Sequence, residues 1–176
     1  MTPSRSGQGE ADAVRVMNGL RRLVKVLSTS ARAQTQARRV SGAQLFVLRQ
    51  IAAHPGLTIG ELAARTFSGQ STVSGVVARL VEQGLIARRP GEEDARQTVL
   101  TLTRKGERAV DGSEPVAQEK LAHALSEMPA AMRAALAEGL EAWLAAADVS
   151  DEPATMFFED AQPRRKRAVV KKGRRS

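Results

Sequence analysis

The chain has 176 residues, 42% of them hydrophobic and 3% aromatic, which indicates one mainly helical domain with a modest core. It contains no cysteine, which excludes disulfides, a catalytic thiolate and Cys-ligated zinc. The apolar runs are too short to span a bilayer, and the N-terminus lacks the apolar segment of a signal peptide. We therefore expect a cytoplasmic protein with no membrane partner.

The net charge of +8 is concentrated at the C-terminal end. Residues 163–176 hold eight of the 27 basic residues and no acidic one, which leaves the rest of the chain formally neutral. We expect an acidic linker over 148–162 and then a disordered basic tail that attracts nucleic-acid phosphates regardless of sequence. The basic residues of this tail are Arg164, Arg165, Lys166, Arg167, Lys171, Lys172, Arg174 and Arg175.

The first part of the chain predicts two helices. Residues 1–10 are rich in Ser, Gly and Pro, and we expect them to be disordered. Over 11–38, apolar residues recur at intervals of three and four, which predicts one long amphipathic helix. Ser41 and Gln44 then form a capping box that opens a second helix, which should end at the Pro-Gly step after His54.

The next segment has the pattern of a helix-turn-helix. A second capping box, from Thr58 to Glu61, opens a short helix that should end at residues 67–69. A longer amphipathic helix follows over 70–83, and Gly84 stands where a left-handed C-cap is expected. Two short helices joined by a brief turn containing glycine are typical of this motif.

A β-hairpin and two more helices complete the predicted fold. Residues 85–89 and 98–103 read as strands, the second of them alternating, and the charged loop 90–95 joins them into a wing. Helical spacing returns over 104–127 and again over 129–147. The predicted fold class is therefore mainly α with a small β-hairpin wing.

The polar leading edge of the 70–83 helix is the candidate DNA-reading surface, because the second helix of such a motif enters the major groove. In the wing, we expect the carboxylate of Asp94 to hold the guanidinium of Arg96 ready for a narrow minor groove. Each feature alone fits an ordinary solvated surface equally well, and only their combination favours DNA binding. The DNA-binding candidates are Gln70, Ser71, Thr72, Ser74, Gly75, Arg79, Arg88, Asp94 and Arg96.

Several short motifs within residues 62–106 resemble, in order and spacing, the signature of the MarR family. The resemblance implies a winged helix-turn-helix over 41–106 within a domain spanning 11–147. The motifs are Leu62-Ala63, Ser71-Thr72-Val73-Ser74, Arg79-Leu80, Gly84-Leu85-Ile86 with Arg88, Asp94-Ala95-Arg96, and Leu102-Thr103 followed by Gly106.

The resemblance implies a homodimer that represses transcription by binding a specific double-stranded DNA site. The terminal helices, over 11–38 and 107–147, would interlock between the two chains. It also implies control by a small aromatic or phenolic effector bound between the dimerisation and DNA-binding parts, at residues that spacing does not identify. The dimer-interface candidates are Val14, Met17, Leu121, Leu125, Met132, Leu136 and Leu140.

Two departures from the family pattern leave the DNA sequence open. Gly75 stands where many members carry a long polar or basic residue, and Ala95 replaces a second basic residue of the wing. An alternative is a nucleoid-associated architectural protein that binds DNA with low sequence specificity, which the basic tail favours. A further alternative is an interaction module that keeps the scaffold without binding DNA.

Enzymatic chemistry is not expected. His54 and His123 are isolated and show no metal-ligand spacing, so we predict no metal and no cofactor. The carboxylates of the wing, Glu92 to Asp94, lie in a predicted hairpin loop that lacks the enclosed pocket needed to shift a pKa.

Overall fold

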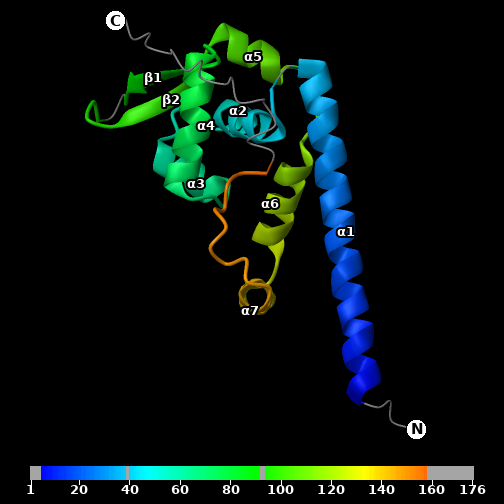
Figure 1. The fold of residues 1–176 in the computed structure, drawn as a ribbon. Coiled ribbons are helices and arrows are strands. Elements are labelled where there is room, and N and C mark those ends of the chain that lie inside the picture. Colours follow the sequence, from blue (N-terminus) through cyan, green and yellow to red (C-terminus); the bar gives the residue numbers. More distant parts are fainter. Residues whose placement is uncertain (1–4, 39, 92–93, 158–176) are drawn as a thin grey trace, which may run out of the picture.

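The computed structural model describes residues 5–38, 40–91 and 94–157. It confirms a mainly α fold with one two-stranded antiparallel hairpin (Figure 1). A head formed by α2 to α5 and the hairpin lies beside α1 and α6. The elements are α1 (Arg5–Arg38), α2 (Gly42–Ala53), α3 (Ile59–Arg65), α4 (Gln70–Glu82), β1 (Ile86–Pro90), β2 (Thr98–Leu102), α5 (Arg104–Val110), α6 (Ala117–Glu127) and α7 (Ala130–Ala146).

Local side-chain caps set the starts of α2 and α3, as predicted. The amide of Gln44 donates to Ser41 Oγ at 3.1 Å, and the amide of Ser41 donates back to Gln44 Oε1 at 2.9 Å. Thr58 and Glu61 form the same reciprocal pair at the start of α3. Gly84, just after α4, has a φ of +69°, which confirms the predicted left-handed residue.

The core of the head is an apolar cluster shared by three helices and the hairpin. Phe46 and Leu48 of α2, Leu62 of α3 and Leu80 of α4 are fully buried in it. Leu100 of β2 is buried in the same cluster, and its amide donates to the carbonyl of Leu57 before α3 at 2.8 Å. This contact fastens the hairpin to the helix-turn-helix.

The hairpin joins α5 through a close backbone approach. β1 pairs with β2 from Ile86 opposite Leu102 to Pro90 opposite Thr98. A Cβ placed on Gly106 in α5 would lie 2.1 Å from the carbonyl oxygen of Leu85. Only glycine fits at this junction.

Two boundaries and the burial of one linker residue differ from the sequence-based expectations. α1 begins at Arg5, so residues 5–10 are helical rather than disordered, because extending a formed helix adds one hydrogen bond per residue fixed. The helix predicted over 104–127 is broken between α5 and α6, where Gly112 takes a φ of +60° and a proline follows at position 115. The acidic linker is not solvated throughout, since Met156 is buried in the head core.

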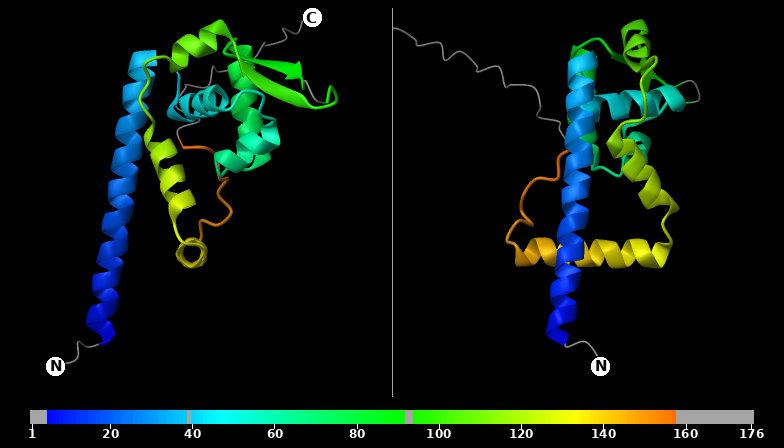
Figure 2. Two further views of the ribbon diagram at one scale, coloured as in Figure 1. Left: turned by 180° about the vertical axis from the view of Figure 1, so that it is seen from behind. Right: turned by 90° about the vertical axis from the view of Figure 1, so that its right-hand side faces the viewer.

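The last helix extends away from the head. In Figure 2, α7 runs roughly perpendicular to α1 beyond the end of α6, and none of its residues is buried. Among the described residues, no helix is both long and apolar enough to cross a membrane. Residues 1–4, Glu92 and Glu93, the end of the linker and the whole basic tail lie outside the described residues.

Candidate nucleic-acid interface

Helix α4 presents one apolar and one polar side, as a recognition helix must. Val73, Val76 and Leu80 face the head core and are fully buried. At 100° per residue, Ser71 and Gly75 fall on the opposite side of the helix. The α3–α4 turn is tight, with the Thr66 hydroxyl donating to the Leu62 carbonyl at 2.8 Å.

The predicted reading residues of α4 do not all share one environment. Ser71 and Arg79 are exposed, whereas Ser74 and Gly75 are half-buried. Gln70 leans back onto α3, because a Cβ on Gly60 would lie 3.2 Å from Gln70 Nε2. The outward face of α4 therefore carries mainly small polar groups.

Thr72 lies on the flank of α4 and has a partner that the sequence did not suggest. Its hydroxyl donates at 3.3 Å to the carbonyl of Ala154, which belongs to the segment after α7. The Thr72 side chain is half-buried. The segment that follows the last helix thus touches the proposed reading surface.

The wing tip is ordered differently from the prediction. Asp94 Oδ1 accepts a hydrogen bond from the backbone amide of Arg96 at 2.9 Å, and the Asp94 carbonyl accepts from the Gln97 amide at 3.0 Å. The expected Asp94–Arg96 ion pair is therefore wrong: a carboxylate two residues earlier closes an Asx turn on the backbone. The turn fixes the backbone at Arg96, whose side chain is exposed.

The base of the wing carries two exposed arginines, Arg88 and Arg89. Arg88 lies opposite Leu100 and Arg89 lies opposite Val99 in the hairpin register. Neighbouring residues of a strand point to opposite faces, so the two guanidinium groups lie on opposite faces of the wing. The sequence contained no signal that would choose between them as a DNA contact.

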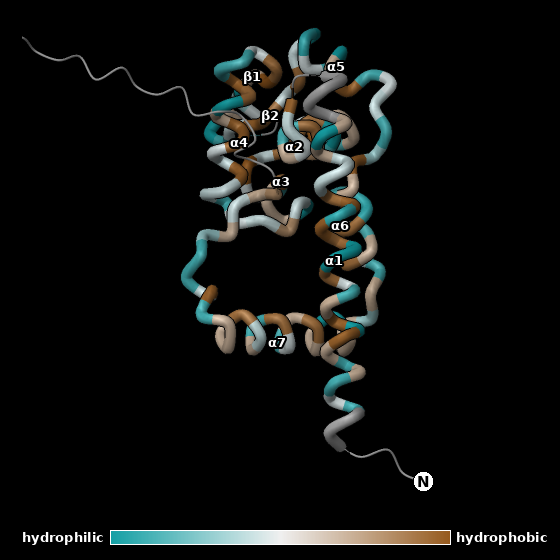
Figure 3. The backbone as a smooth tube through the Cα atoms, turned by 45° about the vertical axis from the view of Figure 1, so that its right-hand side comes forward, coloured by the Kyte–Doolittle hydropathy of each residue, from teal (hydrophilic) through white to brown (hydrophobic). Residues whose placement is uncertain are grey.

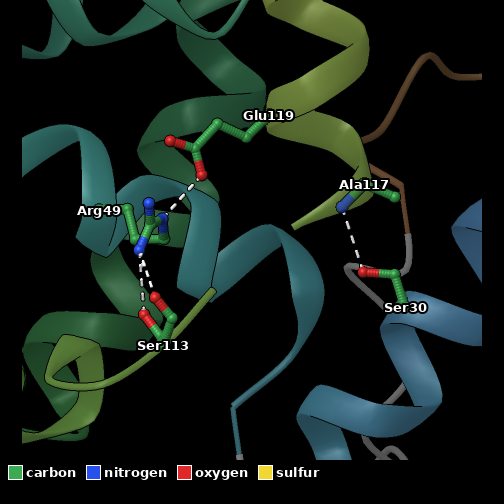
Figure 4. A network of polar contacts seen from close by, with 5 residues as sticks. All are labelled: Ser30, Arg49, Ser113, Ala117 and Glu119. Carbon is green, nitrogen blue, oxygen red and sulfur yellow. Dashed lines mark hydrogen bonds and ion pairs between the residues drawn. The ribbon is translucent and has the colours of Figure 1, made fainter. Parts of the chain in front are cut away.

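A polar joint connects the head to the helices outside it (Figure 4). Arg49 of α2 forms an ion pair with Glu119 of α6 at 2.7 Å, and its Nη1 donates to the Ser113 carbonyl at 2.8 Å. Beside it, the amide of Ala117 donates to Ser30 Oγ of α1 at 3.1 Å. Sequence reasoning missed the joint, because Arg49 and Glu119 lie 70 positions apart.

The electrostatic surroundings of α3 are set by its cap. Hydrogen bonds from the backbone and then the side chain of Thr58, with a smaller effect of the Arg65 charge, hold the pKa of Glu61 below its ordinary value. Glu61 is therefore ionised at neutral pH, and its negative charge in the first turn of α3 stabilises the helix through the helix dipole.

No metal-ligand cluster accompanies this surface in the part of the chain that the structure describes. Residues 5–38, 40–91 and 94–157 contain no cluster of His, Asp or Glu suited to a metal ion. The space where α1, α2 and α6 meet, lined by Leu27, Gly42 and Val116 among others, measures about 10 Å³. That volume holds about one water molecule.

Comparison with known sequences relates this head to a known family. Residues 40–97 match the sequence profile described as the MarR family. The chain is 29% identical over 141 residues to the HTH-type transcriptional regulator Mb0904 of Mycobacterium bovis, which covers 80% of this chain and 98% of that protein. It is 31% identical over 88 residues to the HTH-type transcriptional regulator BilQ of Clostridium symbiosum, covering 50% of this chain and 61% of the other.

Solved structures of the same fold agree. The DNA complex of MepR from Staphylococcus aureus superposes with a TM-score of 0.51 at 20% identity, covering 74% of this chain and 96% of that one. BpsR of Bordetella bronchiseptica, whose DNA binding is regulated by 6-hydroxynicotinic acid, superposes with a TM-score of 0.50 at 24% identity, covering 73% and 91% of the two chains. At these identities the likeness shows the fold alone.

Proposed function

Because the chain belongs to the MarR family of winged helix-turn-helix transcriptional regulators, we propose that it is a homodimeric repressor that binds a specific duplex site. The family is a class of regulators and not of enzymes. The observation that carries the proposal is the outward face of α4, small and polar, beside a wing whose arginines are exposed. Such a helix fits the major groove while a wing arginine reaches the adjacent minor groove.

Each part of the surface has a distinct role in this proposal. Ser71, Thr72 and Ser74 would approach base edges, since their short side chains let the helix backbone come close. Arg79 and an arginine at the base of the wing would bind phosphates, which fixes the position of the head. Arg96, aimed by the Asp94 turn, would enter the minor groove. Gly75 would allow close backbone approach, and Gln70, whose side chain leans onto α3, would add little direct readout.

Unpartnered apolar surface supports the dimer. α7 exposes Met132, Leu136 and Leu140 to 64%, 49% and 47%, and α1 exposes Val14 and Met17 to 53% and 38%. Figure 3 shows hydrophobic residues recurring along both helices. An apolar helix without a buried face is not stable in water, and a second copy of the same helices would cover it. Leu121 and Leu125 of α6 are half-buried and would complete that interface.

Site selection from random-sequence duplex with the full chain tests the proposal, followed by affinity measurement on the selected duplex. Arg96→Ala and Thr72→Ala should each weaken specific binding by about 1 to 3 kcal/mol. Arg15→Ala is the matched control, because it removes the same charge from an exposed position on α1. Equal affinities for Arg96→Ala and Arg15→Ala would contradict the proposed role of the wing.

The basic tail favours a second candidate, an architectural protein that coats DNA. Competition with random duplex separates the two, because a regulator should hold its site orders of magnitude more tightly. We assign the tail, residues 163–176, a supporting role in non-specific phosphate attraction. Its deletion should lower the slope of log affinity against log salt by up to about 7 units, from roughly 0.9 per phosphate. An unchanged slope would contradict this role.

Small-molecule control and location complete the proposal. The space among α1, α2 and α6 is about the size of one water molecule, so an effector would need the head to shift against these helices or a pocket formed by the dimer. Such a shift would change the spacing of the two heads and release the duplex. We place the protein in the cytoplasm, on the nucleoid.

A further inference from the structure

The segment that follows α7, residues 148–157, folds back onto the head although it contains no helix or strand. Met156 is 3% exposed and belongs to the head core cluster, while its neighbour Phe157 is 54% exposed. Two positions earlier, the Ala154 carbonyl accepts the hydrogen bond from Thr72 on α4. We name this segment the strap.

We propose that the flank of α4 is a docking surface for the strap of the same chain, and that the strap and DNA compete for it. The inference rests on the proposed function, because it assumes that α4 meets DNA. It adds a second occupant to the reading surface, with Met156 as the anchor and Ala154 as the group that contacts α4.

The hydrogen-bonding capacity of Thr72 makes the two occupants exclusive. A threonine hydroxyl has one proton to donate, so while it donates to Ala154 it cannot donate to a base or a phosphate. The strap backbone also lies within hydrogen-bond distance of α4, in space that a duplex seated on the Thr72 flank would need. A bound duplex therefore requires the strap to leave.

The negative charge of the strap also disfavours DNA binding. It carries Asp148, Asp151 and Glu152 and no basic residue. Carboxylates on a segment tied to α4 through Ala154 would repel the phosphates of an approaching duplex, and the repulsion would fall once the strap moves away. An acidic segment on a DNA-reading surface thus acts as an internal competitor.

A single buried side chain, Met156, anchors the strap in the head core. Burial of a methionine side chain removes apolar surface from water, which favours docking. The other backbone hydrogen bonds described for the strap either stay within it, as from the Thr155 amide to the Pro153 carbonyl at 2.9 Å, or reach the end of α7, as from the Val149 amide to the Leu144 carbonyl at 3.1 Å. None of these bonds needs to break when the strap leaves α4. A strap docked about nine-tenths of the time would weaken the apparent DNA affinity about tenfold.

The test compares Met156→Ala with Phe157→Ala in the full chain, so that the basic tail is present in every protein. The probe is a duplex recovered from random-sequence selection carried out with both the unmodified chain and Met156→Ala. We expect Met156→Ala to bind the duplex about tenfold more tightly than the unmodified chain does. Phe157→Ala should bind the duplex with the same affinity as the unmodified chain. If Met156 only stabilised the head, Met156→Ala would weaken DNA binding. If Met156 anchors a competing strap, the same change strengthens binding, so the direction of the effect separates the two roles.

Hydrogen exchange on the unmodified chain gives a second measurement. Adding the duplex should speed amide exchange in the strap while slowing it in α4. Protection of the strap that persists in the DNA complex would overturn the proposal, as would a Met156→Ala affinity equal to or below that of the unmodified chain. Both results leave the proposed function standing. If neither the unmodified chain nor Met156→Ala selected any duplex, both the proposed role of the strap and the proposed function would be overturned.

Discussion

Gly106 offers a sharp test of how the wing is fixed to the head. In Gly106→Ala, the new Cβ would lie 2.1 Å from the Leu85 carbonyl oxygen, and 3.4 Å from Leu102 Cδ2. That carbonyl cannot move aside freely, because it accepts the Thr103 amide at 3.1 Å. Overpacking costs about 1 to 3 kcal/mol and a weakened hydrogen bond about 1 kcal/mol more, against a gain of about 1 kcal/mol in helix propensity. We expect a net loss of about 2 kcal/mol in unfolding free energy.

Urea unfolding at one fixed protein concentration measures this change, because association would otherwise alter the apparent stability. Gly19→Ala is the control: it also lies within a helix, but its Cβ would meet nothing within 4 Å. It should stabilise α1 by up to about 1 kcal/mol. If Gly106→Ala is as stable as Gly19→Ala, the close approach at the base of the wing does not constrain the fold and the reasoning is refuted.

Three further predictions concern the joint, the cap and the dimer. Arg49→Met should cost about 1 to 2 kcal/mol in urea unfolding by leaving Glu119 unpaired, and adding Glu119→Leu should recover most of it; no recovery would show that the pair is not coupled. The folded-state pKa of Glu61 is lowered, so its stabilising effect is complete above its ordinary value of 4.5 and is lost as pH falls through the folded value. Glu61→Gln should therefore flatten the acid side of a plot of melting temperature against pH, and an unchanged profile would contradict this. Leu136→Glu should yield a monomer in size-exclusion chromatography with the far-UV spectrum retained, whereas a persistent dimer would place the interface elsewhere.

Local interactions explain why much of the head was predictable from sequence. The two capping boxes, the left-handed Gly84 and the alternation of the second strand all depend on residues within four positions of one another. The apolar stripe of α4 likewise follows from helical spacing alone, and it identified which side of the helix faces outward. The helix-turn-helix could therefore be predicted before any tertiary contact was known.

Tertiary structure decided two kinds of feature: contacts between residues far apart in the sequence, and contacts for which a residue has more than one possible neighbour. Arg49 meets Glu119 across 70 positions, and Gly106 is required by a carbonyl of another element, because relative placement of elements is not encoded in their periodicity. Asp94 accepts a hydrogen bond from the Arg96 backbone amide, although the Arg96 guanidinium was an equally feasible partner. The spacing of the two residues in the sequence does not distinguish between these partners. Met156 carried no periodic pattern at all, and only the packed head revealed that it is buried. The sequence alone thus determined which helix carries a polar outward face, while the fold determined what holds that helix in place and what covers its flank.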